Sequence, residues 1–273
     1  MFALSEHLLQ QTIAIAQQAG EHLMRFYQRA EVAVEIKSDN TPVTEVDLFL
    51  SQFLIEKLTA VSPNIPVLSE EQSDIPLSER VQWARYWLID PLDGTKQFIN
   101  RTGNFSILIA LMERDANGQP RPILSVIEAP VSGKTYYAMK GFGAYKMEQN
   151  RSQRLLPRSF AGQTLRIAVG SHSEKPKVQA ILKKFFAEFV ILGSSGLKGA
   201  LVAEGLADCY VRLGNTSEWD TAAAELLLAE MGGKVMSTQF APLTYNQRES
   251  LVNPHFVMVA DGQLDWPTIF QFN

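Results

Sequence analysis

The sequence predicts an α+β fold that continues as α/β in its second half, and three observations support this. Helical and then strand-like segments fill the first half without regular alternation, which is typical of helices on one side of a largely antiparallel sheet. After a polar stretch, strand-like and helix-like segments alternate. The chain has 273 residues, of which 46% are hydrophobic and 20% charged, as in a globular protein with a sizeable core.

Helical spacing dominates the first 60 residues. Residues 5–28 carry apolar side chains at near-helical spacing, and residues 32–36 alternate between apolar and polar side chains, which predicts a short strand. Pro42 and its polar neighbours mark a loop. Thr44 followed by Asp47 has the spacing of a helix-start box, so we expect a second helix to begin there.

The middle of the chain is strand-like. The run from 106 to 112 is nearly all apolar, which predicts a strand covered on both faces. The other predicted strands of this sheet are 66–68, 86–89, 123–127 and 134–139.

The polar segment 150–163 predicts a boundary between two domains, residues 1–155 and residues 156–273. Beyond it, alternation of the two kinds of element predicts an α/β unit. The predicted strands are 165–169, 189–192, 209–212, 234–236 and 256–260, and the predicted helices are 175–186, 196–207 and 221–231.

Composition excludes several classes of protein. Lys and Arg number 25 against 29 Asp and Glu, a net charge of −4 that argues against binding of a nucleic acid polymer. A single cysteine, Cys209, excludes an internal disulfide or cysteine-built zinc site, favours a reducing compartment and is expected in the core. No signal-peptide pattern and no apolar run of about 18–20 residues occurs. We therefore expect a cytoplasmic protein without an integral membrane segment.

The segment after strand 86–89 places two carboxylates close together. Asp90 and Asp93 flank a tight Pro- and Gly-containing loop. Two partly buried carboxylates at this spacing repel each other unless a cation lies between them. Oxygen ligands without His or Cys favour Mg²⁺ over zinc, and the main-chain carbonyl of Leu92 is a further candidate ligand. The alternative is that both acids only cap a turn.

Acidic residues follow or begin three other elements. Glu70 comes at the end of strand 66–68, and Asp220 precedes the helix 221–231. Asp47 lies in the first turn of its own helix. Each has a plain structural alternative, a solvated loop for Glu70 and a helix cap for the two aspartates.

Four motifs, in order, make the sequence similar to the Mg²⁺-dependent, lithium-sensitive phosphatases typified by inositol monophosphatase. The resemblance covers about residues 5–260 and implies a layered αβαβα sandwich. The motifs are Pro42-Val43-Thr44-x-x-Asp47, Ser69-Glu70-Glu71, Asp90-Pro91-Leu92-Asp93-Gly94-Thr95 with Phe98, and Trp219-Asp220-Thr221-Ala222-Ala223 leading to Gly232-Gly233.

Within this family the sequence most resembles the bacterial CysQ-type 3′(2′),5′-bisphosphate nucleotidases. Lys96 is typical of that branch, as are the segments 170–173 and 193–198 and the pair Asn253-Pro254. Two positions depart from the pattern of the branch, Gln97 where Glu is usual and an extra Gly196.

The resemblance implies a role for each matching residue. Glu70, Asp90, Asp93, Asp220 and the Leu92 carbonyl would bind two or three Mg²⁺ ions. Thr95 would orient the attacking water, Asp47 would accept a hydrogen bond from Thr95, and Glu70 would share the role of general base. The implied substrate-binding residues are Gly94, Thr95, Ser171, His172, Gly193, Ser194, Ser195, Lys198 and Arg212, with Lys198 and Arg212 as candidates for a second phosphate.

The expected reaction is hydrolysis of 3′-phosphoadenosine 5′-phosphate to AMP and phosphate, with the sulfated analogue as a second candidate substrate. The resemblance places this reaction in sulfate assimilation. An inositol or sugar phosphatase of the same fold is the first alternative, and a non-catalytic sensor of Mg²⁺ and nucleotide is the second. The oligomeric state is open, with a homodimer as one candidate.

Overall fold

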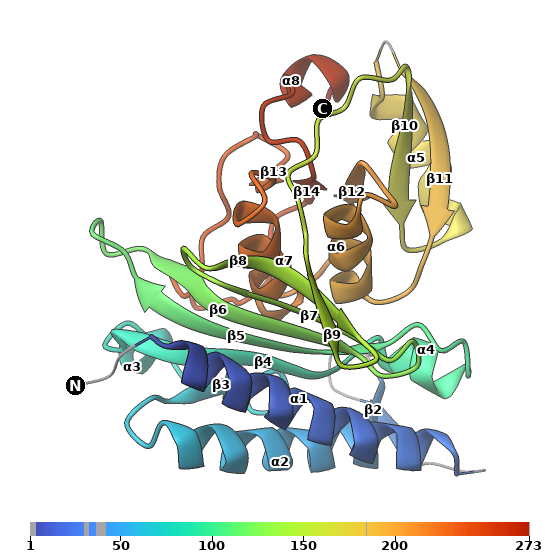
Figure 1. The fold of residues 1–273 in the computed structure, drawn as a ribbon. Helices are drawn as coiled ribbons and strands as arrows, with labels where there is room; N and C mark the ends of the chain where they lie inside the picture. Colours follow the sequence, from blue (N-terminus) through green and yellow to red (C-terminus); the bar gives the residue numbers. More distant parts are fainter. Residues whose placement is uncertain (1–3, 30–32, 37–41, 184, 273) are drawn as a thin grey trace.

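The computed structural model describes residues 4–29, 33–36, 42–183 and 185–272. Figure 1 shows five layers in the order helices, sheet, helices, sheet, helices, which confirms the predicted sandwich. Helices α1 (Glu6–Tyr27) and α2 (Glu45–Val61) cover one face of the larger sheet, and α6 (Ser195–Glu204) and α7 (Trp219–Ala229) lie between the two sheets. Helices α5 (Lys175–Ile181) and α8 (Trp266–Ile269) pack on the outer face of the smaller sheet.

The larger sheet has seven strands in the order β3-β4-β5-β6-β7-β8-β9, and only the β3–β4 pair is parallel. The prediction of a largely antiparallel sheet is therefore confirmed for the described residues. The strands are β3 (Val67–Ser69), β4 (Arg85–Asp93), β5 (Ser106–Arg114), β6 (Pro120–Ala129), β7 (Lys134–Met139), β8 (Gly143–Glu148) and β9 (Arg151–Arg154). The last two were not predicted, and for β9 the reason is that all four of its residues are exposed and lack apolar alternation.

The smaller sheet has five strands in the order β11-β10-β12-β14-β13, with β10 parallel to both β11 and β12. The strands are β10 (Thr164–Val169), β11 (Phe186–Ile191), β12 (Cys209–Arg212), β13 (Lys234–Ser237) and β14 (Phe256–Val259). Short elements complete the described chain, namely β1 (Val34–Ile36), β2 (Pro42–Thr44), α3 (Leu77–Arg80), α4 (Thr95–Ile99) and the 3₁₀ turn η1 (His172–Glu174). Val32, predicted to begin a strand, lies outside the described residues.

The predicted helix 175–186 was too long. Helix α5 ends at Ile181, because Leu182 adopts an extended conformation and forms an isolated bridge with Phe270. The chain then enters β11 at Phe186. A tertiary pairing, which the local sequence does not show, ends this helix.

The predicted start of α2 is confirmed. The Thr44 backbone N–H donates to Asp47 Oδ2 at 2.8 Å, and the Asp47 backbone N–H donates to Thr44 Oγ1 at 3.4 Å. Both residues are buried, so this reciprocal cap fixes the direction in which Asp47 points.

The seven-stranded sheet and the small β1–β2 sheet lie before residue 155, the five-stranded sheet lies after it, and α6 and α7 pack between the two large sheets. A single hydrophobic cluster contains Leu108 and Ala110 of β5, Leu227 of α7 and Met258 of β14. The C-terminal end of β4 and the N-terminal end of α7, which both carry aspartates, therefore lie in the same region. No helix in the described ranges is long and apolar enough to span a membrane.

Candidate active site

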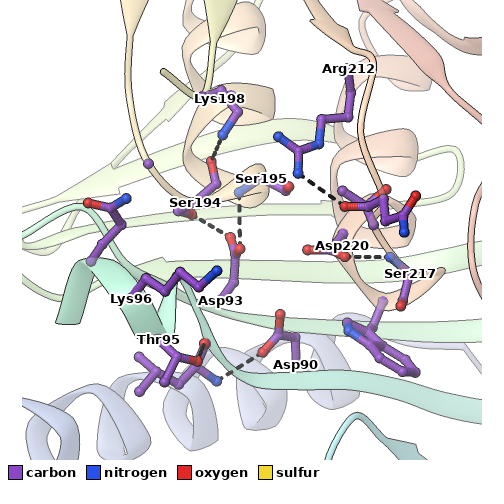
Figure 2. A pocket seen from close by; sticks show the side chains of 18 of the residues that line it. Asp90, Asp93, Thr95, Lys96, Ser194, Ser195, Lys198, Arg212, Ser217 and Asp220 are labelled. Atoms are coloured by element: carbon purple, nitrogen blue, oxygen red, sulfur yellow. Dashed lines mark hydrogen bonds between the residues drawn. The ribbon is translucent and has the colours of Figure 1, made fainter. Parts of the chain in front are cut away.

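A cavity of about 730 Å³ opens where the ends of β4, α6, β12 and α7 meet. Figure 2 shows Asp90, Asp93 and Asp220 around one space, with Lys198 of α6 and Arg212 of β12 approaching from the other side. The cavity therefore has an acidic part and a basic part.

Local geometry positions two of these acids. Strand β4 continues past its predicted end at residue 89 to Asp93, through an irregularity in its pairing with β5, so the tight loop predicted between Asp90 and Asp93 is instead an irregular part of the strand. Within it, the Leu92 N–H donates to Asp90 Oδ1 at 3.0 Å. Asp220 lies in the first turn of α7, one residue past the helix start, and its Oδ2 accepts the Ser217 N–H at 2.6 Å.

One carboxylate oxygen each of Asp90, Asp93 and Asp220 lies within 4.8 Å of the others. Burial raises the pKa of Asp90 well above its usual value, and the charges of Glu70, Asp93 and Asp220 raise it further. Burial and the charge of Asp93 raise the pKa of Asp220 to about 8. Three crowded carboxylates resist joint ionisation without a cation, and this all-oxygen donor set fits Mg²⁺.

Asp93 also links the two halves of the chain. Its Oδ2 accepts hydrogen bonds from Ser106 Oγ at 3.0 Å, from the Gly196 N–H at 2.8 Å and from Ser194 Oγ. Its Oδ1 accepts the Ser195 N–H at 3.0 Å. The start of α6 is thereby held against the end of β4.

The extra glycine noted in the sequence has a steric reason. A Cβ on Gly196 would lie 2.3 Å from Leu108 Cδ2 and 3.2 Å from Asp93 Oδ2. The close approach of α6 to β5 therefore requires glycine at this position.

Thr95 connects the acidic part of the cavity to α2. Its hydroxyl lies 3.0 Å from Asp47 Oδ1 and 3.2 Å from the Leu92 carbonyl oxygen. The turn before it depends on Gly94, whose φ is +96° and whose Cβ would lie 2.9 Å from the Asn104 carbonyl oxygen. Asp47 itself is buried behind Thr95.

The two cations of the basic part are held differently. Lys198 Nζ donates to the carbonyl oxygens of Ser194 at 2.6 Å and Leu192 at 3.2 Å, and burial lowers its pKa to about 8. Arg212 Nη1 donates to Glu174 Oε1 at 2.8 Å. Both side chains line the cavity.

The structure brings most of the predicted site residues to this cavity. Among the described residues, the lining does not include Asp47, which acts from behind Thr95, or His172, which is exposed on η1. The predicted residues that line it are Glu70, Asp90, Leu92, Asp93, Gly94, Thr95, Ser171, Gly193, Ser194, Ser195, Lys198, Arg212 and Asp220.

Some residues of the site were missed by sequence reasoning. Ser106 lies inside an apolar run, where nothing marks its contact with Asp93. Glu174 and Thr216 also line the cavity. The polar residues just before Trp219 could have given a signal for Thr216, together with Asn215 and Ser217, which also line the cavity, whereas nothing in the sequence marks Glu174.

The sandwich and its cluster of buried and half-buried carboxylates define a class of metal-dependent hydrolases built on two stacked sheets. The sequence profile of the inositol monophosphatase family matches residues 4–264, and the chain belongs to this family. Members of this family depend on Mg²⁺.

Curated relatives and solved structures refine the comparison. The chain is 57% identical to the 3′(2′),5′-bisphosphate nucleotidase CysQ of Haemophilus influenzae, with 100% of both chains covered. It is 40% identical to the Salmonella typhimurium protein of the same name, over 91% of this chain and 98% of that one. The crystal structure of CysQ from Bacteroides thetaiotaomicron matches with a TM-score of 0.77 at 32% identity, covering 93% of this chain and 97% of that one.

Proposed function

We propose that this chain is a Mg²⁺-dependent 3′(2′),5′-bisphosphate nucleotidase that converts 3′-phosphoadenosine 5′-phosphate and water to AMP and inorganic phosphate. The observation that carries the proposal is that one cavity holds a carboxylate cluster and, besides Lys96, two cations that come from α6 and β12, Lys198 and Arg212. A substrate with two phosphates matches both parts. Identity of 57% over the full length of a nucleotidase supports the same substrate.

Glu70, Asp90, Asp93, Asp220 and the Leu92 carbonyl would hold two or three Mg²⁺ ions. Bound there, Mg²⁺ neutralises the reacting phosphate, stabilises the leaving oxygen and lowers the pKa of water. The raised pKa values of Asp90 and Asp220 support this assignment, because a cation relieves the repulsion that raises them.

Thr95 and Asp47 would orient the attacking water. A carboxylate is a stronger acceptor than a carbonyl, so the Thr95 hydroxyl proton points to Asp47 rather than to Leu92. A lone pair of Thr95 is then left to accept a hydrogen bond from the water, and Glu70 shares the role of general base. The water would attack phosphorus in line and give up one proton to the general base. The bond to the 3′-oxygen breaks, and that oxygen takes up one proton from solvent water, so that the products are AMP and hydrogen phosphate with no covalent intermediate.

The remaining predicted residues would bind the substrate. Lys198 and Arg212 would contact the second phosphate, because they are the cations on the far side of the cavity from the carboxylates. The other predicted residues would contact the reacting phosphate, the sugar or the base. They are Gly94, Ser171, Gly193, Ser194 and Ser195, together with His172, which is exposed next to Ser171.

The same-fold alternative, an inositol or sugar phosphatase, would offer these two cations no second substrate phosphate. A non-catalytic sensor is disfavoured because a competent residue lies at each proposed metal and water-orienting position. The nucleotidase reading places the chain in sulfate assimilation, with inhibition by lithium as in the family. A cytoplasmic location and a homodimer stay predictions.

The test is phosphate release from 3′-phosphoadenosine 5′-phosphate, its sulfated analogue and inositol 1-phosphate, each with Mg²⁺ and with a chelator. We expect Mg²⁺-dependent release and a higher kcat/KM for the nucleotide. A kcat/KM tenfold higher for the inositol phosphate would show that the proposed substrate is wrong. Binding of the nucleotide without turnover would favour the sensor.

A further inference from the structure

Glu174 lines the cavity, yet the hydrolysis described above gives it no role. It is the last residue of η1 and joins two parts of the substrate end. Its Oε1 accepts Arg212 Nη1 at 2.8 Å, and its Oε2 accepts the Gly170 N–H at 2.7 Å. One carboxylate therefore holds both a guanidinium on β12 and the loop that follows β10.

Arg212 depends on this contact for its orientation. Its other terminal nitrogen, Nη2, donates to the Asn215 carbonyl oxygen at 3.0 Å, and among the described residues its buried Nε has no hydrogen-bond partner. Glu174 and Asn215 thus fix the two ends of the guanidinium. Without Glu174 the long side chain would regain rotamers that turn the charge away from the cavity.

Two glycines make room for the pair. A Cβ on Gly170 would lie 3.3 Å from both Arg212 Nη1 and Glu174 Oε1, and a Cβ on Gly214 would lie 3.4 Å from Arg212 Cζ. The backbone therefore packs directly against the ion pair, which makes its geometry well defined.

The charge of Glu174 works against an anionic ligand, because it offsets part of the field of Lys198 and Arg212. An acid here is useful only if the orientation that it imposes outweighs this loss. We propose that Glu174 is a positioning residue that aims Arg212 at the second phosphate of the substrate and so sets the preference for bisphosphates over monophosphates. This inference rests on the proposed function.

The experiment compares two substrates with the same reacting group. 3′-Phosphoadenosine 5′-phosphate and adenosine 3′-monophosphate differ only in the 5′-phosphate. For Glu174→Ala we expect a roughly tenfold lower kcat/KM on the bisphosphate, through KM, and a change below about twofold on the monophosphate. Glu174→Gln keeps one of the two acceptor contacts, so its loss of kcat/KM on the bisphosphate should be smaller than that of Glu174→Ala.

A second set of variants tests whether Glu174 acts through Arg212. In an Arg212→Ala background, Glu174→Ala should cause no further loss on the bisphosphate, because the group that it positions is absent. The matched control is Asp208→Asn, which breaks the Arg166–Asp208 pair of 2.6 Å at the opposite end of β10 and β12. This control should leave the substrate preference unchanged.

Three results would overturn the inference. The first is an equal loss of kcat/KM on both substrates, and the second is an unchanged preference for the bisphosphate. The third is a higher kcat/KM on the bisphosphate with Glu174→Gln, which is expected if only the charge of Glu174 mattered. Should Glu174→Ala fail to fold, Glu174→Gln carries the same comparison. A wild-type protein that releases no phosphate from the bisphosphate refutes the proposed function, whereas an active wild type with insensitive variants refutes only the role of Glu174.

Discussion

The hydroxyl of Thr95 lies 3.0 Å from Asp47 Oδ1, a hydrogen bond that joins the start of α4 to the first turn of α2. Asp47 is held in place by the reciprocal cap with Thr44, so the acceptor is rigid. The bond fixes the direction in which the Thr95 hydroxyl donates its proton, and thereby the direction from which this hydroxyl can accept a hydrogen bond.

Removal of this hydroxyl should slow the chemical step. We expect Thr95→Val to lower kcat by roughly 10²–10⁴-fold with little change in KM, because a positioned proton-transfer partner contributes about that much. Thr95→Ser keeps the hydroxyl and should stay within about tenfold of the wild type. Steady-state kinetics at saturating Mg²⁺ checks this, and a Val variant as fast as the Ser variant would contradict it.

Asp93 should affect both activity and stability. It accepts hydrogen bonds from four donors that come from β5 and the start of α6. Asp93→Asn turns one acceptor into a donor, so we expect phosphate release to be lost and the free energy of unfolding without Mg²⁺ to fall by about 1–3 kcal/mol.

Thermal unfolding and phosphate release, measured on the same preparations, check this prediction. Ser106→Ala is the control, because it removes one donor and keeps the carboxylate. It should lose far less activity than Asp93→Asn. Near-normal turnover in Asp93→Asn would show that Asp93 is not a metal ligand.

Residue spacing alone could predict only local features, whereas the approach of Asp220 to the β4 acids and of Asp47 to Thr95 was predicted through the family resemblance. The cap at Thr44 and the close approach of Asp90 and Asp93 follow from residues a few positions apart, and the structure has both. Contacts across the fold left no such pattern. The bridge of Leu182 to Phe270, the contact of Ser106 with Asp93 and the packing of α7 on the larger sheet all join distant segments.

Glu128 should make stability depend on pH. It is buried on β6, accepts a hydrogen bond from Thr135 Oγ1 at 2.7 Å, and burial raises its pKa to about 7. Because folding raises the pKa of Glu128, this group stabilises the folded protein fully only below the pKa of about 4.3 that it has in the unfolded chain. This contribution to the free energy of unfolding is lost as pH rises to about 7. The loss at higher pH is on the order of 3 kcal/mol.

Glu128→Gln removes this titration while keeping nearly the same shape. We expect it to be more stable than the wild type at pH 8 and similar at pH 4.5, as measured by denaturant unfolding. Glu204→Gln is the contrasting variant, because Glu204 pairs with Lys146 at 2.8 Å and Lys134 at 3.2 Å. Glu204→Gln should lower the free energy of unfolding at pH 8. A Glu128→Gln variant that is less stable than the wild type at pH 8 would contradict the prediction.

Gly196→Ala should disturb the site through packing alone. The added Cβ would lie 2.3 Å from Leu108 Cδ2 and 3.0 Å from Ser106 Oγ, so either the buried Leu108 side chain or α6 must shift. Overpacking of this kind costs about 1–3 kcal/mol, and a shift of α6 would also separate the Gly196 N–H from Asp93. We expect a lower melting temperature and reduced turnover. Leu108→Val shortens the side chain that the added Cβ would clash with. The double variant Gly196→Ala/Leu108→Val should therefore regain part of the lost melting temperature and part of the lost turnover. Strictly additive effects would show that the contact with Leu108 is not the cause.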